Sequence, residues 1–234
     1  MTVAPAQVET GPRARLQARV SELVGARHPV RVLDAGCGHR LPIPIADDLH
    51  VVGIDLDATQ LRSGLDEAIV GDLVASYLGH ERFDAIVCWN VLEHVAYPPI
   101  VLARFADALA PGGVAILGLP HAASVKGLVT KFTPQPVHAW AWRRLFGGGS
   151  DHEEFETVMA WTLRPAGLRR LAASLGLTVE MLEEYESWTQ RRIRGRLGLT
   201  GRRFRVLSWL VRTATLGQVV LDRTDLVALL RRAV

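Results

Sequence analysis

A short run near the start of the chain has the composition of a turn against which a ligand binds. Residues 32–40 read VLDAGCGHR. The apolar part of this run ends in Asp34, and Gly36 and Gly38 follow. Glycines at the carboxyl end of a strand let a ligand lie against bare backbone. A second apolar run ends in Asp55, a carboxylate placed to accept hydrogen bonds from ribose hydroxyls. The pattern predicts a site for a nucleoside-containing cofactor.

The glycine turn is poorly suited to a cofactor that carries phosphates. A dinucleotide fingerprint reads G-x-G-x-x-G, and Gly36 and Gly38 fit it, but the last position is Leu41. A pyrophosphate also favours a regular helix start beneath the turn, and Pro42 and Pro44 interrupt the helix expected there. A nucleoside cofactor without phosphates would not need that helix start.

The elements that position these acids alternate regularly along the chain. Residues 14–27 have the spacing of an amphipathic helix. We expect strands at 29–36, 49–57, 67–73, 82–90, 112–120, 177–185 and 223–232, and further helices at 97–113, 164–175 and 203–214. Strands that are apolar throughout, separated by helix-length segments, favour a buried, mostly parallel sheet with helices on both faces. We expect one α/β domain over residues 1–234.

Five motifs along the chain occur in the order and spacing of a known family. They read VLDAGCG, VVGIDLD, VGDL, FDAIVCWNVLEHV and LAPGGVAILGLPH, within residues 28–121. They resemble class I S-adenosylmethionine-dependent methyltransferases, most closely the small-molecule branch with the ubiquinone-biosynthesis enzymes. The resemblance implies a Rossmann-like, doubly wound sheet of seven strands with the last antiparallel, and a helical lid or insertion. It also implies S-adenosyl-L-methionine as cofactor and S-adenosyl-L-homocysteine as product. The family often has a third glycine where this chain has Arg40.

The same resemblance assigns residues to the cofactor. Those expected around its methionine part are Asp34, Gly36, Cys37, Gly38, Trp89 and Asn90, the last two mainly through backbone. Those expected around the adenosine are Asp55 at the ribose, Leu56 and Leu73 beside the adenine, and Asp72 near its amino group. Two simpler interpretations stay open, because Asp55 or Asp72 would also suit a helix cap.

Two histidines follow predicted strands where, by the resemblance, the reactive sulfonium would lie. His94 comes after the fourth strand and His121 ends the fifth. A histidine titrates near neutral pH, so either would serve as a general base for a hydroxyl acceptor. In the alternative interpretation Glu93 caps a helical turn and His94 packs. Methyl transfer is an in-line displacement, in which holding nucleophile, methyl and sulfur in line supplies much of the catalysis.

The two cysteines and one acidic run give little support to other chemistry. Both cysteines lie in apolar runs, which suits reduced thiols, and Cys37 has no evident histidine or metal partner. Cytosine C5 methylation uses a cysteine nucleophile that follows a proline, whereas Cys88 follows Val87, so this motif is absent. Amino methylation of bases typically uses Asn/Asp-Pro-Pro-aromatic, and this chain reads NVLE. We therefore expect no nucleic-acid acceptor. DHEEFE at 151–156 lacks the second histidine of H-E-x-x-H, which predicts no metal site.

Charge is concentrated near the carboxyl end. The net charge is +3, and residues 191–205 hold seven arginines. This run would be a solvated face, an anionic-substrate site or a membrane-surface patch. In the following helix Phe204, Leu207, Leu210 and Val211 share one side, and Arg205 and Arg212 lie on another. We expect the apolar side to cover the sheet, with contact to an anionic membrane surface as the alternative.

The expected function follows from these segments. Residues 28–121 would be the cofactor-binding core, 121–163 an acceptor-side insertion, and 186–222 a basic helical segment. The 121–163 segment loosely resembles methyltransferases near polysaccharide and glycolipid pathways. We expect methyl transfer to oxygen of a small-molecule, glycan or glycolipid acceptor, by a cytoplasmic protein, with a peripheral location at the inner membrane face as an option. The alternatives are a non-catalytic S-adenosylmethionine binder and an NAD(P)-dependent oxidoreductase. No apolar run is long enough for a signal peptide or a membrane-spanning helix.

Overall fold

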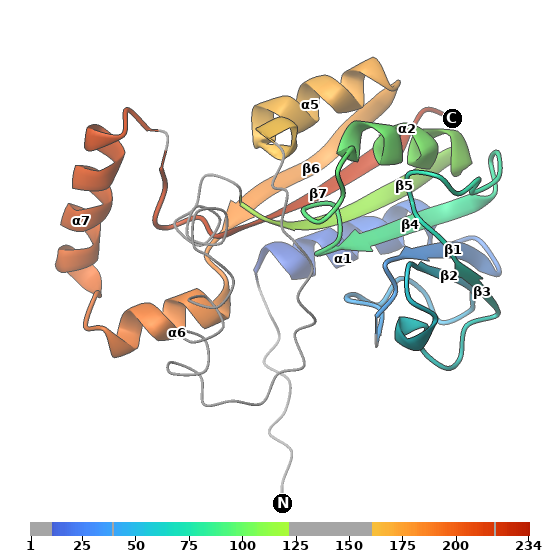
Figure 1. The fold of residues 1–234 in the computed structure, drawn as a ribbon, viewed down its shortest axis with the longest axis horizontal. Coiled ribbons are helices and arrows are strands. Elements are labelled where there is room, and N and C mark those ends of the chain that lie inside the picture. Colours follow the sequence, from blue (N-terminus) through green and yellow to red (C-terminus); the bar gives the residue numbers. More distant parts are fainter. Residues whose placement is uncertain (1–10, 39, 122–160, 218) are drawn as a thin grey trace, which may run out of the picture.

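Within the described residues, seven strands form one central sheet (Figure 1). The computed structural model describes residues 11–38, 40–121, 161–217 and 219–234. The strands lie in the order β3 (Glu67–Val70), β2 (Leu49–Asp55), β1 (Val30–Ala35), β4 (Phe83–Trp89), β5 (Leu109–Pro120), β7 (Asp225–Arg232) and β6 (Leu177–Tyr185). The first five pair in parallel, and β7 is antiparallel to both β5 and β6. The predicted doubly wound sheet with an antiparallel last strand is confirmed.

The strands carry the core because most of their side chains are apolar on both faces. In β4 every residue from Phe83 to Cys88 is buried, and in β7 the five residues from Leu226 to Leu230 are buried. Such continuous apolar strands need cover on both sides. The strand bounds depart little from the sequence expectation: β3 ends at Val70, and β5 already begins at Leu109.

Helices cover the two faces unequally. On one face α1 (Pro12–Val24) buries Leu16, Val20 and Val24, which recur every fourth residue and therefore share one side of the helix. On the other face lie α2 (Pro98–Ala108) and α5 (Pro165–Ser174), as Figure 1 shows. Prolines occupy the first turns of all three helices, where their missing N–H has no intrahelical partner to lose. The prediction of helices on both faces is confirmed.

The helix expected after the glycine turn is absent, and two later connections also contain no α-helix. Residues 40–48, after the glycine turn, are irregular, and residues 71–82 form only a turn. Between β2 and β3 there is a single 3-10 turn, η1 (Ala58–Gln60). After the glycine turn the cause is the two prolines of LPIPIADD, which remove backbone donors. Ile43 and Ile45 are instead buried on the α1 side of the sheet, where the helix would have packed.

The basic segment forms two helices that stand apart from the sheet. They are α6 (Trp188–Arg196) and α7 (Gly201–Ala214), drawn at the left of Figure 1. All residues of both helices are described, and none of them is buried. The expectation that the apolar side of α7 covers the sheet is therefore wrong. α6 and α7 do not pack on the sheet because the chain turns away from the sheet after β6 and returns to it only at β7 (Figure 1).

Two further expectations concern the remaining parts of the chain. The predicted lid or insertion falls almost wholly on residues 122–160, outside the described residues, and η2 (Trp161–Leu163) follows it. In the described part of the chain, no helix is both long and apolar enough to cross a membrane.

Candidate functional site at the carboxyl edge of the sheet

The parallel register brings the predicted cofactor residues to one edge of the sheet. Asp34 pairs with Gly53 of β2 and with Val87 of β4. The next residues of all three strands therefore leave the sheet side by side. Ligands of open α/β sheets bind outside this carboxyl edge. The edge thus collects the glycine turn after β1, Asp55 at the end of β2, and the loop after β4.

The glycine turn has the backbone that its sequence predicts. Gly36 has a φ of +73°, and its N–H donates to the carbonyl of Ile54 at 2.8 Å. An added Cβ at Gly36 would lie 2.3 Å from Cγ2 of Val91, so only glycine fits. Gly38 has a φ of +45°, and an added Cβ there meets no described atom within 4 Å. Among the described atoms, Gly38 therefore leaves room beside its backbone, as a bound cofactor would require.

A largely buried guanidinium that the sequence analysis did not identify reaches into this turn. Nη1 of Arg62 forms an ion pair with Oδ2 of Asp34 and donates to the carbonyl of Cys37 at 3.0 Å. The two side chains are 13% and 4% exposed. Burial raises the pKa of Asp34 to about 6, and the Arg62 guanidinium acts against that rise. The methionine end of the predicted site thus holds a buried carboxylate and a largely buried cation in contact.

The residues at the end of β2 show which aspartate caps the helical turn that follows the strand. Asp57, not Asp55, caps η1, since its Oδ1 accepts from the N–H of Thr59 at 2.8 Å. Oδ1 of Asp55 accepts from the N–H of Asp57 at 3.2 Å. Leu56 beside it is 63% exposed, which is unusual for a large apolar side chain next to a strand end. Asp55 and Leu56 together form a polar and an apolar surface at the edge.

The residues after β3 differ in their suitability for the adenine. Asp72 is exposed and its Oδ1 accepts from the N–H of Val74 at 2.8 Å, so it caps the turn, as the simpler interpretation expected. Leu73 is 6% exposed and belongs to the core cluster under α2. Leu73 therefore contributes mainly to packing.

Trp89 and Asn90, the two residues predicted for the cofactor site at the end of β4, have different surroundings. The indole of Trp89 lies over Gly118 of the neighbouring β5, where an added Cβ would be 2.2 Å from Cδ2 of the ring. The guanidinium of Arg13, from α1, lies 4.8 Å above that ring. The Trp89 side chain therefore packs on the α1 face. Asn90 is exposed and has a φ of +56°, a conformation that is concentrated at functional sites in residues other than glycine.

Both cysteines are buried and unsuited to nucleophilic catalysis. Burial raises the pKa of the Cys37 thiol, and it raises that of the fully buried Cys88 well above its ordinary value. A thiol acts as a nucleophile only when ionised. Cys37 serves by its size, since its Sγ would lie 3.2 Å from a Cβ added at Gly53.

The two candidate histidines lie at the same edge in different surroundings. His94 lies in a turn that its N–H closes onto the carbonyl of Val91 at 2.9 Å, and its side chain is 31% exposed. His121 is only 6% exposed. Its Nε2 lies 2.5 Å from Oε1 of Glu184, whose other oxygen accepts from Arg223 at 2.5 Å. His121 thus belongs to a histidine–carboxylate pair that joins β5 to β6.

Metal ligation has no candidate among the described residues. There, no three histidine, cysteine, aspartate or glutamate side chains gather in a way that could hold a metal ion. The acidic run at 151–156 lies outside the described residues.

The chain belongs to the Methyltransferase domain family, whose model matches residues 9–182. It is 28% identical over 181 residues to the ubiquinone biosynthesis O-methyltransferase of Xanthomonas axonopodis pv. citri, covering 69% of each chain. The family and the seven-stranded fold together define an S-adenosylmethionine-dependent methyltransferase. The oxidoreductase alternative has no support in these similarities.

Two solved structures share the fold at low identity. One is an S-adenosylmethionine-dependent methyltransferase from Archaeoglobus fulgidus, with a TM-score of 0.52, 15% identity and 95% of both chains covered. The other is phosphoethanolamine N-methyltransferase 2 of Haemonchus contortus in complex with S-adenosyl-L-methionine. It has a TM-score of 0.54 and 13% identity, and the match covers 94% of this chain and 53% of that one. The cofactor of this chain is S-adenosylmethionine.

Proposed function

We propose that this methyltransferase methylates an oxygen of a small molecule, glycan or glycolipid. The observation that carries the proposal is the pairing of His121 with Glu184 at the carboxyl edge. A hydroxyl acceptor must lose a proton, and a histidine oriented by a carboxylate is suited to take it. The name of the Xanthomonas relative, an O-methyltransferase, supports the choice of oxygen.

Residues of the edge would divide the binding of S-adenosylmethionine between them. Asp34 would accept hydrogen bonds from the cofactor ammonium, with backbone of Gly36, Cys37 and Gly38 beside it. Asp55 would accept hydrogen bonds from the ribose hydroxyls. Asn90 would close the methionine end through its backbone. These roles suit the burial of Asp34 and the left-handed backbone of the glycines.

The adenine end would be formed by fewer residues. Leu56 would cover one face of the base with its exposed side chain. Asp72 would reach the adenine amino group with the carboxylate oxygen that does not cap its own turn. We assign Leu73 and the Trp89 side chain to packing behind this surface.

Catalysis would rest on alignment and on proton removal. When bound, S-adenosylmethionine supplies an activated methyl group. The chain's own residues hold the acceptor oxygen in line with it, which lowers the entropy cost of reaction. His121 would take the proton from the acceptor hydroxyl, and Glu184 would orient the imidazole. His94, which is more exposed, would contact the acceptor.

The remaining segments would form the acceptor side. We infer that α1 and residues 121–163 flank the acceptor, while residues 28–121 bind the cofactor. We also propose a cytoplasmic location with peripheral contact at the inner membrane face. That contact would suit an acceptor on a lipid carrier.

Transfer of a labelled methyl group tests the proposed chemistry. The protein is incubated with S-adenosylmethionine labelled in the methyl group and with aqueous and lipid extracts of cells. We expect a labelled product that releases methyl iodide in hot hydriodic acid, as methyl ethers and esters do. A product that retains its label as N-methyl or C-methyl groups would contradict methylation of oxygen. Binding of S-adenosylhomocysteine with no labelled product in either extract would favour the non-catalytic alternative.

Variants of the histidine pair test the role of the base. His121→Gly should lower kcat by roughly 10²- to 10⁴-fold, the usual contribution of a general base, with little change in cofactor affinity. Added imidazole should restore part of the rate, which a purely structural role would not allow. Glu184→Gln should lower kcat less, and His94→Asn should mainly raise the KM of the acceptor. Equal rates for His121→Gly and wild type would reject His121 as the base.

A further inference from the structure

The α6–α7 arm, which we define as residues 188–216, is a basic element on an acidic body. Residues 187–221 contain eight arginines and no lysine, aspartate or glutamate. Because the whole chain carries +3, the rest of it carries a net charge of −5. Because none of the helical residues of the arm is buried, its charge does not serve to stabilise the packing of the fold.

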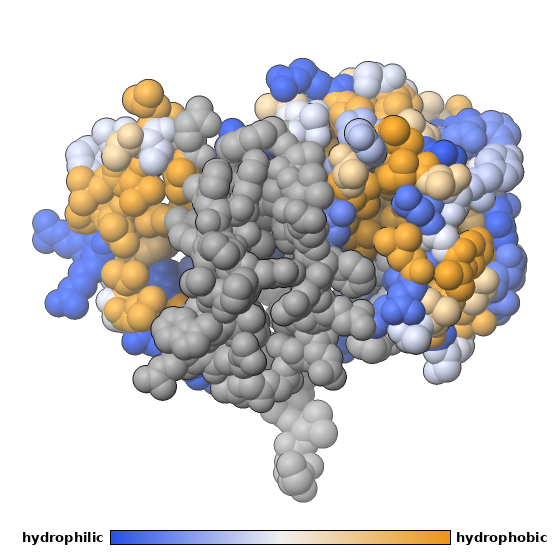
Figure 2. Space-filling model, in the orientation of Figure 1, coloured by the Kyte–Doolittle hydropathy of each residue, from blue (hydrophilic) through white to orange (hydrophobic). Residues whose placement is uncertain are grey.

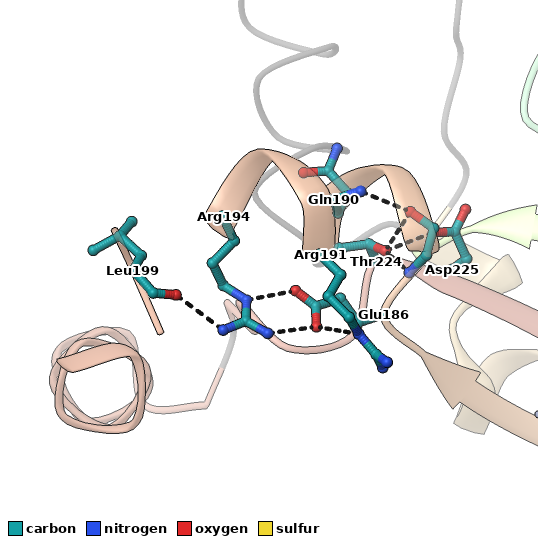
Figure 3. A network of polar contacts seen from close by, with 8 residues as sticks. Glu186, Gln190, Arg191, Arg194, Leu199, Thr224 and Asp225 are labelled. Carbon is teal, nitrogen blue, oxygen red and sulfur yellow. Dashed lines mark hydrogen bonds and ion pairs between the residues drawn. The ribbon is translucent and has the colours of Figure 1, made fainter. Parts of the chain in front are cut away.

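One arginine fixes the shape of the arm, as Figure 3 shows. Arg194 donates from Nε and Nη2 to the two oxygens of Glu186, at 2.8 and 3.0 Å. Its Nη1 donates to the carbonyl of Leu199, in the turn before α7, at 2.9 Å. Its guanidinium also lies 4.0 Å from the ring centre of Phe204. A two-pronged charged pair of this kind is specific in geometry, so α6 and α7 are held in one arrangement.

The other seven arginines of the arm do not join α6 to α7 as Arg194 does. Arg191 lies 3.5 Å from the same Glu186, and Arg192 lies over the ring of Trp188. The remaining five are exposed, and within the described residues they form no ion pair: Arg196, Arg202, Arg203, Arg205 and Arg212. A cluster of unpaired guanidinium groups repels itself unless an anion is near. The arm therefore calls for a partner with negative charge.

The same surface exposes large apolar side chains. The arm includes Trp188, Leu197, Val206, Trp209, Leu210 and Leu216, each about half exposed or more. In α7, Val206 and Leu210 are one turn apart and Trp209 is beside them, so the three share the solvent face. Figure 2 shows apolar surface on this lobe with hydrophilic side chains along its outer edge. A partner must therefore accept apolar groups as well as positive charge.

A hollow beside α7 adds a place for a small anionic group. It has a volume of about 280 Å³ and lies between α7 and residues 220–222. Arg205 and Arg212 line it on either side of Trp209, and Asp222 lines it from the other wall. Two guanidinium groups against one carboxylate leave a net positive charge, which suits a phosphate headgroup.

We propose that the α6–α7 arm docks the protein on an anionic lipid bilayer. Trp209, Val206 and Leu210 enter the interface, and the arginines contact lipid phosphates. Basic and aromatic residues in one exposed helix are what an anionic interface binds. This inference deepens the peripheral location proposed above and rests on it. A second copy of the arm is a poor occupant, because a symmetric contact would place sixteen arginines together, twice the eight of one chain.

Co-sedimentation with vesicles tests the charge of the arm. The probes are phosphatidylcholine vesicles with and without about 30 mol% phosphatidylglycerol, at low and at high salt. We expect wild type to bind the anionic vesicles at least about tenfold more strongly, and salt to weaken that binding. Arg202→Glu with Arg203→Glu should lose at least about tenfold in binding. The matched control is Arg169→Glu with Arg170→Glu, an exposed adjacent pair on α5, which should change binding by less than about twofold.

Substitution of Trp209 tests the apolar part of the surface. Trp209→Ser should weaken vesicle binding, whereas Tyr77→Ser should not, although Tyr77 is similarly exposed on the body. Calorimetric binding of S-adenosylhomocysteine should be unchanged in all these variants, so failure of docking is separable from failure of methyl transfer. No binding of wild type to anionic vesicles would overturn the proposal. Equal losses in the two arginine-pair variants, or a wild-type dimer that Trp209→Ser dissociates, would also overturn it.

Discussion

Arg62 and Asp34 meet inside the glycine turn although 28 residues separate them in the chain. Both side chains are nearly inaccessible to solvent, and Nη1 of Arg62 also holds the carbonyl of Cys37. Because the carboxylate is the group proposed to bind the cofactor ammonium, the guanidinium controls how readily that carboxylate is ionised. Arg62 is thus a positioning residue for the turn and an electrostatic partner of its acid.

Removal of Arg62 should shift the pH dependence of cofactor binding. The pKa of Asp34 is about 6, and it would rise further without the cation. Only the carboxylate binds the ammonium, so wild-type affinity should fall as the pH drops through about 6, and Arg62→Ala should lose affinity at a higher pH. Titration calorimetry with S-adenosylhomocysteine between pH 5 and 8 measures both midpoints. Arg82→Ala, which removes an ion pair to Glu67, should leave the midpoint unchanged.

Neutralisation of Asp34 should change the pH dependence of stability. Its pKa is raised from 3.8 to about 6 by burial, so its neutral form favours folding below pH 3.8, and that stability is lost as the pH rises to 6. The free energy of unfolding of Asp34→Asn, relative to wild type, should therefore increase by up to about 3 kcal/mol over this interval. Urea unfolding at several pH values measures the difference.

Asp57 provides a control of opposite sign. The hydrogen bond from the N–H of Thr59 lowers the pKa of Asp57. Its ionised form therefore favours folding, and Asp57→Asn should lose stability relative to wild type as the pH rises. A pH-independent difference for Asp34→Asn would contradict the raised pKa of the buried carboxyl.

Loss of the Asp55 carboxylate should weaken cofactor binding. One or two hydrogen bonds to a charged group, at about 1.5–3 kcal/mol each, correspond to a loss of at least about tenfold in affinity. Calorimetry with S-adenosylhomocysteine on Asp55→Ala measures the loss, and Asp57→Ala is the matched control two residues away. If both variants lost the same affinity, the effect would lie in the loop and not in ribose binding.

The contact between Trp89 and Gly118 should make the glycine irreplaceable. Gly118→Ala would drive its Cβ into the indole, and such overpacking typically costs about 1–3 kcal/mol in the free energy of unfolding. Trp89→Leu combined with Gly118→Ala should recover part of that loss. Urea unfolding of the two single variants and the double variant measures the coupling, and strictly additive effects would show that the two side chains do not interfere.

The sequence was enough to predict which site residues lie at the ends of adjacent strands. Asp34, Gly36 and Gly38 leave β1 together, and Asp55 ends the adjacent strand, so strand order alone brings them to one edge. Arg62 could not be predicted, because its contact with Asp34 depends on how the irregular residues after η1 fold back. The pairing of His121 with Glu184 likewise needs the register of β6 against β7.

The direction of individual side chains was also beyond the sequence pattern. Trp89 ends β4 at the carboxyl edge, and the alternation of side chains along the strand directs its indole toward α1. The apolar side of α7 had the spacing of a covering helix. Periodicity shows that a helix has two faces, but it does not show where the chain on either side carries it.

The position of β7 has a consequence for synthesis on the ribosome. This strand comes after β5 and β6 in the chain and yet lies between them, paired with both. Until residue 232 has left the exit tunnel, the facing edges of β5 and β6 have no partner, and the methyltransferase sheet is divided in two. A nascent chain would therefore carry two unpaired strand edges that a chaperone can bind, and its cooperative folding would wait for the last strand.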